Sequence, residues 1–158
     1  MGAKPPLSPL APAGFPKLPA IAGVSFATTE AGVRYQNRTD VLLVSLAPGT
    51  TVAGAFTRSA TRSAAVLDCQ DKIGGDPAPG AAIVVNSGNA NAFTGRRGTD
   101  SVQAITEAAA RTLGIPASRV FSSSTGVIGE PLPHERIIGC FDDLTAALSP
   151  HAIETAAR

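Results

Sequence analysis

Hydrophobic residues occur along this chain in short runs, separated by polar and glycine-rich stretches. Five runs predict β-strands because they are rich in β-branched and aliphatic residues and are bounded by Gly, Asn, Asp or Pro. They cover residues 21–28, 41–47, 51–57, 82–86 and 120–123. The fourth run is almost wholly apolar, which is typical of a strand buried on both faces. Residues 64–70 fit either a strand or a helix.

Two longer segments have the three- and four-residue spacing of an amphipathic helix. The first begins near Thr99 or Asp100, either of which can cap it, and ends at Gly114. Its apolar face comprises Val102, Ile105, Ala109 and Leu113. The second covers residues 133–148, with a stripe of Ile137, Ile138, Phe141, Leu144 and Leu148. A last helix is expected after Ser149-Pro150, where Ser caps and Pro opens the first turn.

The order of these elements predicts an α/β fold, with mixed sheets covered by helices. Strands come first, followed twice by strand, polar loop and helix. We expect one α/β domain over residues 20–158, preceded by a proline-rich arm at residues 1–19. The last helix reaches Arg158 without a capping residue, so we also expect the domain to continue beyond it.

Composition narrows the function classes. Hydrophobic residues make up 44% of the chain and charged residues 16%, as expected for a folded core. A net charge of +1 disfavours nucleic acid and anionic membranes as partners. No apolar run approaches the roughly 20 residues of a membrane-spanning helix. Cys69 and Cys140 lack the spacing of a zinc site, so we expect two buried thiols and a cytoplasmic protein.

The first candidate for chemistry is the polar sequence NSGNANAFTG at residues 86–95. Asn and Gly tolerate left-handed backbone, so this loop can fold tightly and point side-chain amides into a cavity. A rigid structural turn is an equally good interpretation. The loop has neither the G-x-G-x-x-G pattern of a dinucleotide site nor the Gly-Lys-Ser/Thr end of a P-loop. We therefore expect no cofactor.

The second candidate is SSSTGVIG at residues 122–129, where hydroxyl groups and a glycine follow a strand. A tight turn here can aim the Thr125 hydroxyl and the Gly126 N–H at one point. Two such donors are what a developing oxyanion in acyl transfer requires. A serine nucleophile is disfavoured because the G-x-S-x-G elbow is absent and His134 is the only histidine nearby in sequence.

Together the two loops are more specific than either alone. NSGNANAFTG at 86–95, STGVIGEPLP at 124–133 and LAPGTTVAGAFT at 46–57 resemble the ornithine acetyltransferase (glutamate N-acetyltransferase) family. The similarity extends from about residue 18 to the end of the chain. The family pattern has Cys where this chain has Phe93, a departure that could alter substrate preference if the position lines the pocket.

The resemblance implies a function. Family members move acetyl from N-acetylornithine to glutamate, and some also use acetyl-CoA. A precursor cleaves itself before a threonine, which begins a second, β chain and forms the acetyl-enzyme; the assembly is usually α2β2. The implied fold is a sandwich distantly like the N-terminal-nucleophile hydrolases. Thr125 and Gly126 match the family's oxyanion hole. The cleavage motif does not occur in these 158 residues, so the chain is expected to lack the nucleophile.

Two other functions remain open at this point. A β-aminopeptidase-type hydrolase shares the general fold and the self-processing, but it hydrolyses amides with a serine. A non-catalytic module that binds an amino acid or scaffolds a partner is the third hypothesis. The amino-acid sequences of both loops favour the transferase over either alternative.

Overall fold

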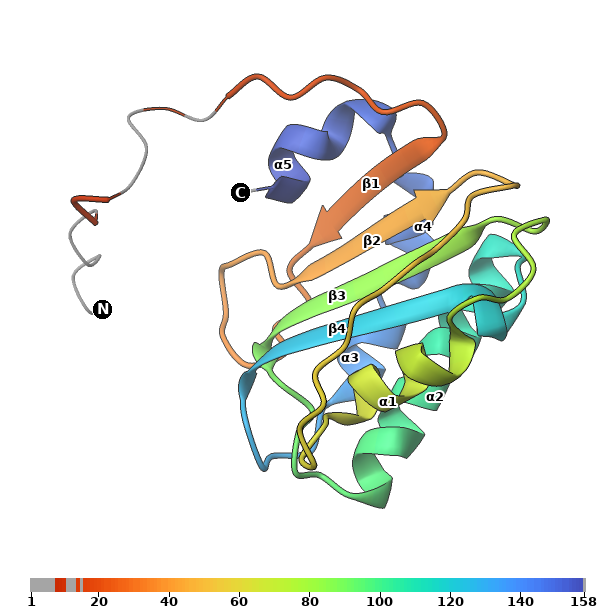
Figure 1. Cartoon of the computed structure of the whole chain (residues 1–158). Helices are drawn as coiled ribbons and strands as arrows, with labels where there is room; N and C mark the ends of the chain where they lie inside the picture. The colour runs from red at the N-terminus through yellow and green to blue at the C-terminus, as the bar shows by residue number, and fades with distance from the viewer. Residues whose placement is uncertain (1–7, 11–13, 15, 158) are drawn as a thin grey trace.

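The computed structural model describes residues 8–10, 14 and 16–157. It contains a four-stranded mixed sheet in the order β1-β2-β3-β4 (Figure 1). β2 is antiparallel to both β1 and β3, whereas β3 and β4 are parallel. The strands are β1 (Val24–Thr29), β2 (Val41–Leu46), β3 (Ala81–Asn89) and β4 (Val120–Val127). The predicted α/β class with a mixed sheet is confirmed.

Helices occupy most of the sequence between and after these strands. The α-helices are α1 (Ala64–Lys72), α2 (Arg96–Leu113), α3 (His134–Ile138), α4 (Phe141–Ala146) and α5 (Ile153–Ala157). Two short 3₁₀ turns, Ala117–Arg119 and Pro150–Ala152, precede β4 and α5. Within the described residues, no helix is long and apolar enough to cross a membrane.

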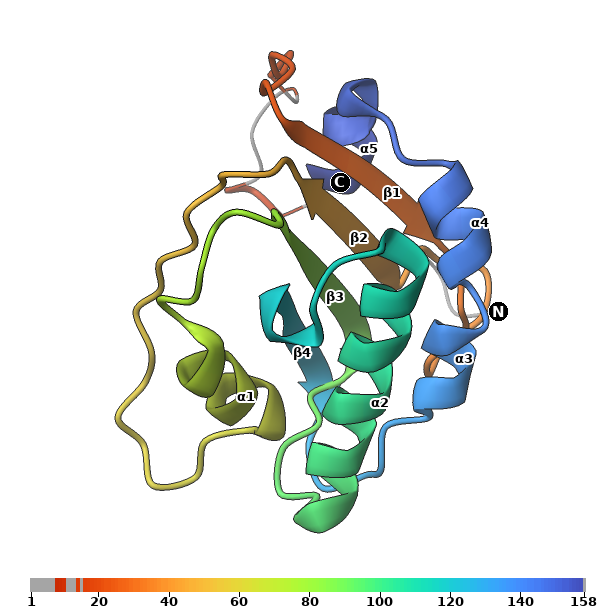
Figure 2. The same ribbon diagram turned by 90° about the vertical axis from the view of Figure 1, so that its right-hand side faces the viewer.

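One face of the sheet and helices α2, α3 and α4 form the main core (Figure 2). Ala27, Leu43 and Val84 are register partners on adjacent strands, so their side chains share this face. Ile105 and Ala109 on α2 pack in the same cluster. Burial of a leucine such as Leu43, which is fully enclosed, contributes roughly 1.5–3 kcal/mol.

Helix α1 resolves the ambiguous segment at residues 64–70 as helical, and it lies along the free edge of β4. Its Lys72 Nζ donates to Val120 O at 3.1 Å, and Cys69 Sγ donates to Ser122 O at 3.3 Å. Covering an edge strand in this way removes a site for unwanted strand pairing. Both cysteines are free, as predicted, although Cys140 is only partly buried.

Residues 51–57 were predicted as a strand, and this prediction is wrong. The segment pairs with no strand and instead crosses the opposite face of β3 and β4 (Figure 1). Val52 and Phe56 pack there in a second, smaller cluster with Phe121. The β-branched residues in this run are explained by packing on the sheet, not by a ladder within it.

The predicted helix at residues 133–148 is two helices, α3 and α4, divided at Gly139 and Cys140. Its apolar stripe continues across the break, because Ile137, Phe141 and Leu144 all enter the main core. Helix α2 also begins earlier than predicted, at Arg96. Its end at Gly114 is confirmed, with that glycine in the left-handed conformation. The predicted arm at residues 1–19 falls largely outside the described residues.

Candidate functional site

The two polar segments singled out from the sequence lie side by side. In the parallel ladder Ser87 pairs with Thr125, and Gly88 pairs with Gly126. Both strands continue into residues that were predicted as loops: β3 runs to Asn89 and β4 to Val127. The candidate site is therefore the carboxyl end of two neighbouring parallel strands, joined through α2.

Strand pairing persists into these polar residues because buried side chains also pair across the ladder. Asn86 is buried; its Oδ1 accepts from Ser124 Oγ at 2.7 Å, and its Nδ2 donates to Asn89 O at 3.0 Å. Both ends of the amide are thus satisfied by this local network, which a buried amide requires. Asn86 shapes the end of β3 and does not point free into a cavity.

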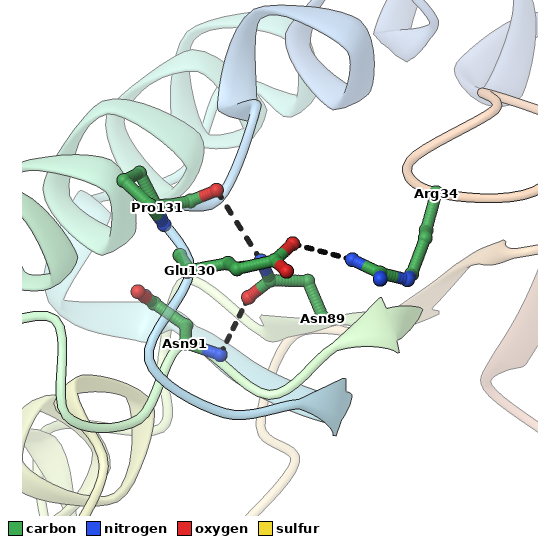
Figure 3. Close-up of polar contacts among 5 residues, drawn as sticks. All are labelled: Arg34, Asn89, Asn91, Glu130 and Pro131. Carbon is green, nitrogen blue, oxygen red and sulfur yellow. Dashed lines mark hydrogen bonds and ion pairs between the residues drawn. The ribbon is translucent and has the colours of Figure 1, made fainter.

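Asn89 ties the first segment to the second (Figure 3). Its Nδ2 donates to Glu130 O at 3.0 Å and to Pro131 O at 3.3 Å, while its Oδ1 accepts from Asn91 N at 2.7 Å. Main-chain bonds add to this link: Ala90 N donates to Val127 O at 2.8 Å. One buried amide therefore fixes the path of the chain after β3 and after β4 together.

Asn91 fastens the same segment to the start of α2. Its Nδ2 donates to Gly98 O at 3.0 Å and its Oδ1 accepts from Thr94 Oγ1 at 3.0 Å. The residue is fully buried and has φ of 47°, a left-handed conformation that Asn tolerates. Of the two interpretations of the Asn-rich loop, these three asparagines support the structural one.

Gly88 and Gly126 allow the strands to approach closely. A β-carbon on Gly126 would lie 2.3 Å from Gly88 C and 2.6 Å from Asn89 N. Gly126 also has φ of 134°, which L side chains rarely adopt. Only glycine fits this position without a shift of backbone.

Unlike the buried asparagines, Thr125 has an exposed side chain, and its hydroxyl makes no hydrogen bond to the described residues. It shares with Ser87 the face of the sheet that α2 does not cover. On this face, Ser87 and strand residues Thr28, Leu42 and Val85 line a hollow of about 630 Å³, together with α5. The Thr125 hydroxyl and the neighbouring Gly126 peptide thus lie at an accessible strand end.

Comparison with known proteins identifies the family. Residues 25–158 match the ArgJ family. This chain belongs to the ArgJ family. It is 65% identical over 152 residues to arginine biosynthesis bifunctional protein ArgJ of Ruegeria pomeroyi and 49% identical over 154 residues to that of Nitrobacter winogradskyi. Each alignment covers 96% of this chain and 37% of the relative, so the chain spans little more than a third of these relatives' length.

Solved structures agree with this assignment. Ornithine acetyltransferase of Mycobacterium tuberculosis, crystallised with ornithine, superposes with a TM-score of 0.76 at 31% identity, over 82% of this chain and 69% of that one. ArgJ of Bacillus halodurans gives a TM-score of 0.70 at 32% identity, over 76% and 62%. The predicted similarity to the sandwich of N-terminal-nucleophile hydrolases is confirmed by these ArgJ neighbours.

His134, the base considered for a serine nucleophile, makes no hydrogen bond to any of the three serines at residues 122–124 in this ArgJ-family chain. Its Nδ1 lies 3.0 Å from Ser101 Oγ on α2, and its Nε2 lies 3.4 Å from Glu135 Oε1. Ser101 is buried, and its hydroxyl proton is donated to Arg97 O. With that proton engaged, Ser101 accepts from His134, so this trio does not form an activated nucleophile.

Phe93 marks a second hollow of the ArgJ-family chain, about 380 Å³ in volume. The ring is 71% exposed, and φ of 56° is unusual for a bulky residue. Arg62 and Leu67 contribute to the same hollow. Arg96 and Arg97, which follow it in sequence, are exposed at the start of α2. Among the described residues, no group of three or more His, Cys, Asp or Glu could hold a metal ion.

Sequence reasoning missed an ion pair between Arg34 and Glu130, in segments 96 residues apart (Figure 3). The hydrogen bond from Arg34 to Glu130 raises the pKa of the guanidinium further above its ordinary value. Asp40 was missed as well; its carboxylate accepts from Ala31 N at 2.7 Å and Val33 N at 2.6 Å and shapes the turn before Arg34. No local pattern in the sequence predicts either contact.

Proposed function

We propose that this chain is the N-terminal part of an acetyltransferase that moves an acetyl group from N-acetylornithine to glutamate through an acetyl-threonine enzyme. Membership of the ArgJ family supports the proposal, as does the name of the M. tuberculosis neighbour, an ornithine acetyltransferase crystallised with ornithine. The same membership favours the transferase over a β-aminopeptidase-type hydrolase or a non-catalytic module.

The observation that carries the proposal is the pairing of an exposed, unbonded Thr125 hydroxyl with the adjacent Gly126 peptide. Attack on the acetyl carbonyl carbon places negative charge on its oxygen. The Thr125 O–H and the Gly126 N–H would donate to that oxygen and stabilise the tetrahedral intermediate. Because the backbone at Gly126 is held by its contact with Gly88, the donor is fixed before the substrate arrives.

In this proposal the nucleophile is a threonine outside these 158 residues, at the start of a second, β chain in an α2β2 assembly. Its hydroxyl oxygen bonds to the acetyl carbon, and ornithine leaves with its amine protonated. The amine of glutamate then attacks the acetyl-enzyme and restores the threonine hydroxyl. Acetyl-CoA is a further candidate donor, and no cofactor is needed for either half-reaction.

The test begins with protein purified at its natural length. A second chain with an N-terminal threonine should accompany this one on a denaturing gel and in intact mass spectra. The preparation should transfer acetyl from N-acetylornithine to glutamate. Thr125→Val should lower kcat by about 10²–10³-fold, whereas Thr125→Ser, which keeps the hydroxyl, should retain most activity.

Three results would count against the proposal. Wild-type protein that transfers no acetyl group to glutamate would refute the reaction. Full activity in Thr125→Val would show that the Thr125 hydroxyl is not part of the oxyanion hole. A single species with no accompanying chain would refute the two-chain arrangement.

A further inference from the structure

Arg34 is held firmly at its backbone. It lies in the connection between β1 and β2, immediately after a turn closed by the buried Asp40 carboxylate. Arg136 on α3 donates to Gly32 O in the same turn. The backbone at Arg34 is therefore held by the Asp40 carboxylate and by Arg136 of α3, independently of any contact of the Arg34 guanidinium.

From that position Arg34 packs on the candidate site. A β-carbon added to Gly88 would lie 3.0 Å from the Arg34 Cβ, and one added to Gly126 would meet Gly88 C at 2.3 Å. Gly88 thus contacts both Arg34 and Gly126. A shift of the Arg34 backbone would be transmitted to the β3 end and from there to Gly126, because close-packed atoms cannot absorb it.

The Arg34 guanidinium forms an ion pair with the carboxylate of Glu130 (Figure 3). Glu130 belongs to the segment that leaves Gly126, and its carbonyl accepts from Asn89 Nδ2 at 3.0 Å. One residue earlier, Gly129 N donates to Ala92 O at 2.8 Å. These other anchors of residues 127–130 come from the last residue of β3 and the chain that follows it, so Arg34 adds a separate anchor from the β1–β2 connection.

We propose that the ion pair between Arg34 and Glu130 positions the Thr125–Gly126 peptide for acyl transfer. The inference rests on the proposed function. Neither side chain touches the reacting atoms; both act by fixing the chain on either side of the oxyanion donors. Such donors must lie 2.7–3.1 Å from the oxyanion to be effective. An error of about 1 Å in a site can cost about 10²-fold in rate.

The experiment compares Arg34→Gln, Glu130→Gln and the double variant in protein of natural length. Each single change should lower kcat roughly 10- to 100-fold, with KM for N-acetylornithine and glutamate changed by less than about twofold. The double variant should be no worse than either single one, as expected for two partners in one interaction. Arg34→Lys should recover much of kcat because it keeps the charge.

Arg38→Gln is the matched control. Arg38 lies on the same connection and over the same Tyr35 ring as Arg34, 5.4 Å against 5.9 Å from the guanidinium carbon to the ring centroid. Arg38→Gln removes the same charge as Arg34→Gln, yet among the described residues Arg38 makes no ion pair with Glu130. This variant should keep the wild-type kcat.

Several outcomes would overturn the positioning role. A rise confined to KM would make Arg34 an anchor for the substrate carboxylate. A lower melting temperature with wild-type kcat would make the pair purely structural. Hydrogen–deuterium exchange separates this inference from the proposed function: the peptide over residues 124–133 should exchange faster in Arg34→Gln than in Arg38→Gln. If the wild type transfers no acetyl group, the proposed function fails, and unchanged exchange would refute the positioning as well.

Discussion

Gly88 and Gly126 face each other across the parallel ladder so closely that a β-carbon on the second would fall 2.3 Å from the carbonyl carbon of the first. Two polar segments of the sequence, 38 residues apart, are joined at this contact. The geometry of the candidate site depends on it, because Thr125 is the residue before Gly126 and its hydroxyl has no hydrogen bond to fix it within the described residues.

Replacing Gly126 should destabilise the protein markedly. Gly126→Ala combines a backbone clash with a φ of 134°, and we expect the free energy of unfolding to fall by roughly 2–4 kcal/mol in urea titrations. Gly129→Ala is the control: φ is 85°, nothing lies within 4 Å of its β-carbon, and the cost should be about 1–2 kcal/mol. Equal costs for the two variants would show that the contact with Gly88 is not limiting.

Asn86→Asp should make stability depend on pH. The Nδ2 of Asn86 donates to Asn89 O at 3.0 Å, and a carboxylate would oppose that carbonyl, at a cost of roughly 1–3 kcal/mol at pH 7. Burial raises the pKa of the introduced carboxyl in the folded state above about 3.9. The Asn86→Asp variant is therefore most stable at low pH, where the protonated acid can donate a hydrogen bond. This stability is lost as the pH rises from the unfolded-state pKa through the folded-state pKa.

The melting temperature of the Asn86→Asp variant, compared with its parent from pH 7 to pH 5, measures this effect. The deficit should shrink as pH falls. Asn37→Asp, on the exposed β1–β2 connection, provides the control and should show no comparable change. A deficit that stays constant over this range in the buried variant would contradict the network drawn around Asn86.

The two thiols should differ in reactivity. Burial raises the pKa of Cys69 above its ordinary value of 9.0, and Cys69 Sγ donates to Ser122 O. Burial also raises the pKa of Cys140, but that side chain is more accessible. With a coloured disulfide reagent at pH 8, one thiol should react quickly and one slowly. Cys140→Ser should abolish the fast phase; loss of the slow phase instead would reverse the assignment.

The raised pKa of Cys69 also has a consequence for stability. Because the folded state disfavours the thiolate, its contribution is fully present below the unfolded-state pKa and is lost as pH rises towards the higher folded-state value. Thermal unfolding between pH 8 and pH 10 should therefore show a decline that is smaller in Cys69→Ala. An unchanged decline would show that the thiol is not its source.

Arg119 should be essential for stability although it lies away from the candidate site. It is buried, and it donates to Gly80 O and Thr50 O at 2.7 Å and to Gly75 O at 3.3 Å. Arg119→Met should lower the free energy of unfolding by roughly 2–3 kcal/mol, since the carbonyl of the buried Gly80 is left unpaired at a cost of about 1–3 kcal/mol and the partly buried Thr50 carbonyl also loses its donor. Arg111→Met, on the exposed side of α2, should change it by less than about 0.5 kcal/mol.

Much of the fold could be predicted because its signals are local. The spacing of Val102, Ile105 and Ala109 gave one apolar face, and all three are buried. The sequence could not reveal that polar residues extend β3, since Asn86 is satisfied by Ser124, 38 residues away. Hydroxyl and amide side chains are typical of loops, and they fit a buried strand only where a partner strand supplies their hydrogen bonds.

The candidate site was predicted in part for the same reason. The composition around Thr125 and Gly126 indicated two oxyanion donors, and that interpretation stays a prediction. What places those residues could not be read from the sequence, because the contacts of Arg34 with Gly88 and Glu130 join distant segments. Contacts between distant segments produce no periodic pattern of residues in the sequence.

The parallel pairing of β3 with β4 also sets when the site can form during synthesis. Among the described residues β4 is the last strand, and α2 lies between it and its partner β3. In a nascent chain β3 could pair with β2, but its other edge would lack a partner until residues up to Val127 had left the ribosome. Of the four described strands, those that carry the candidate site are thus the last to pair, and until they do the open edge of β3 is exposed to wrong pairing with other chains.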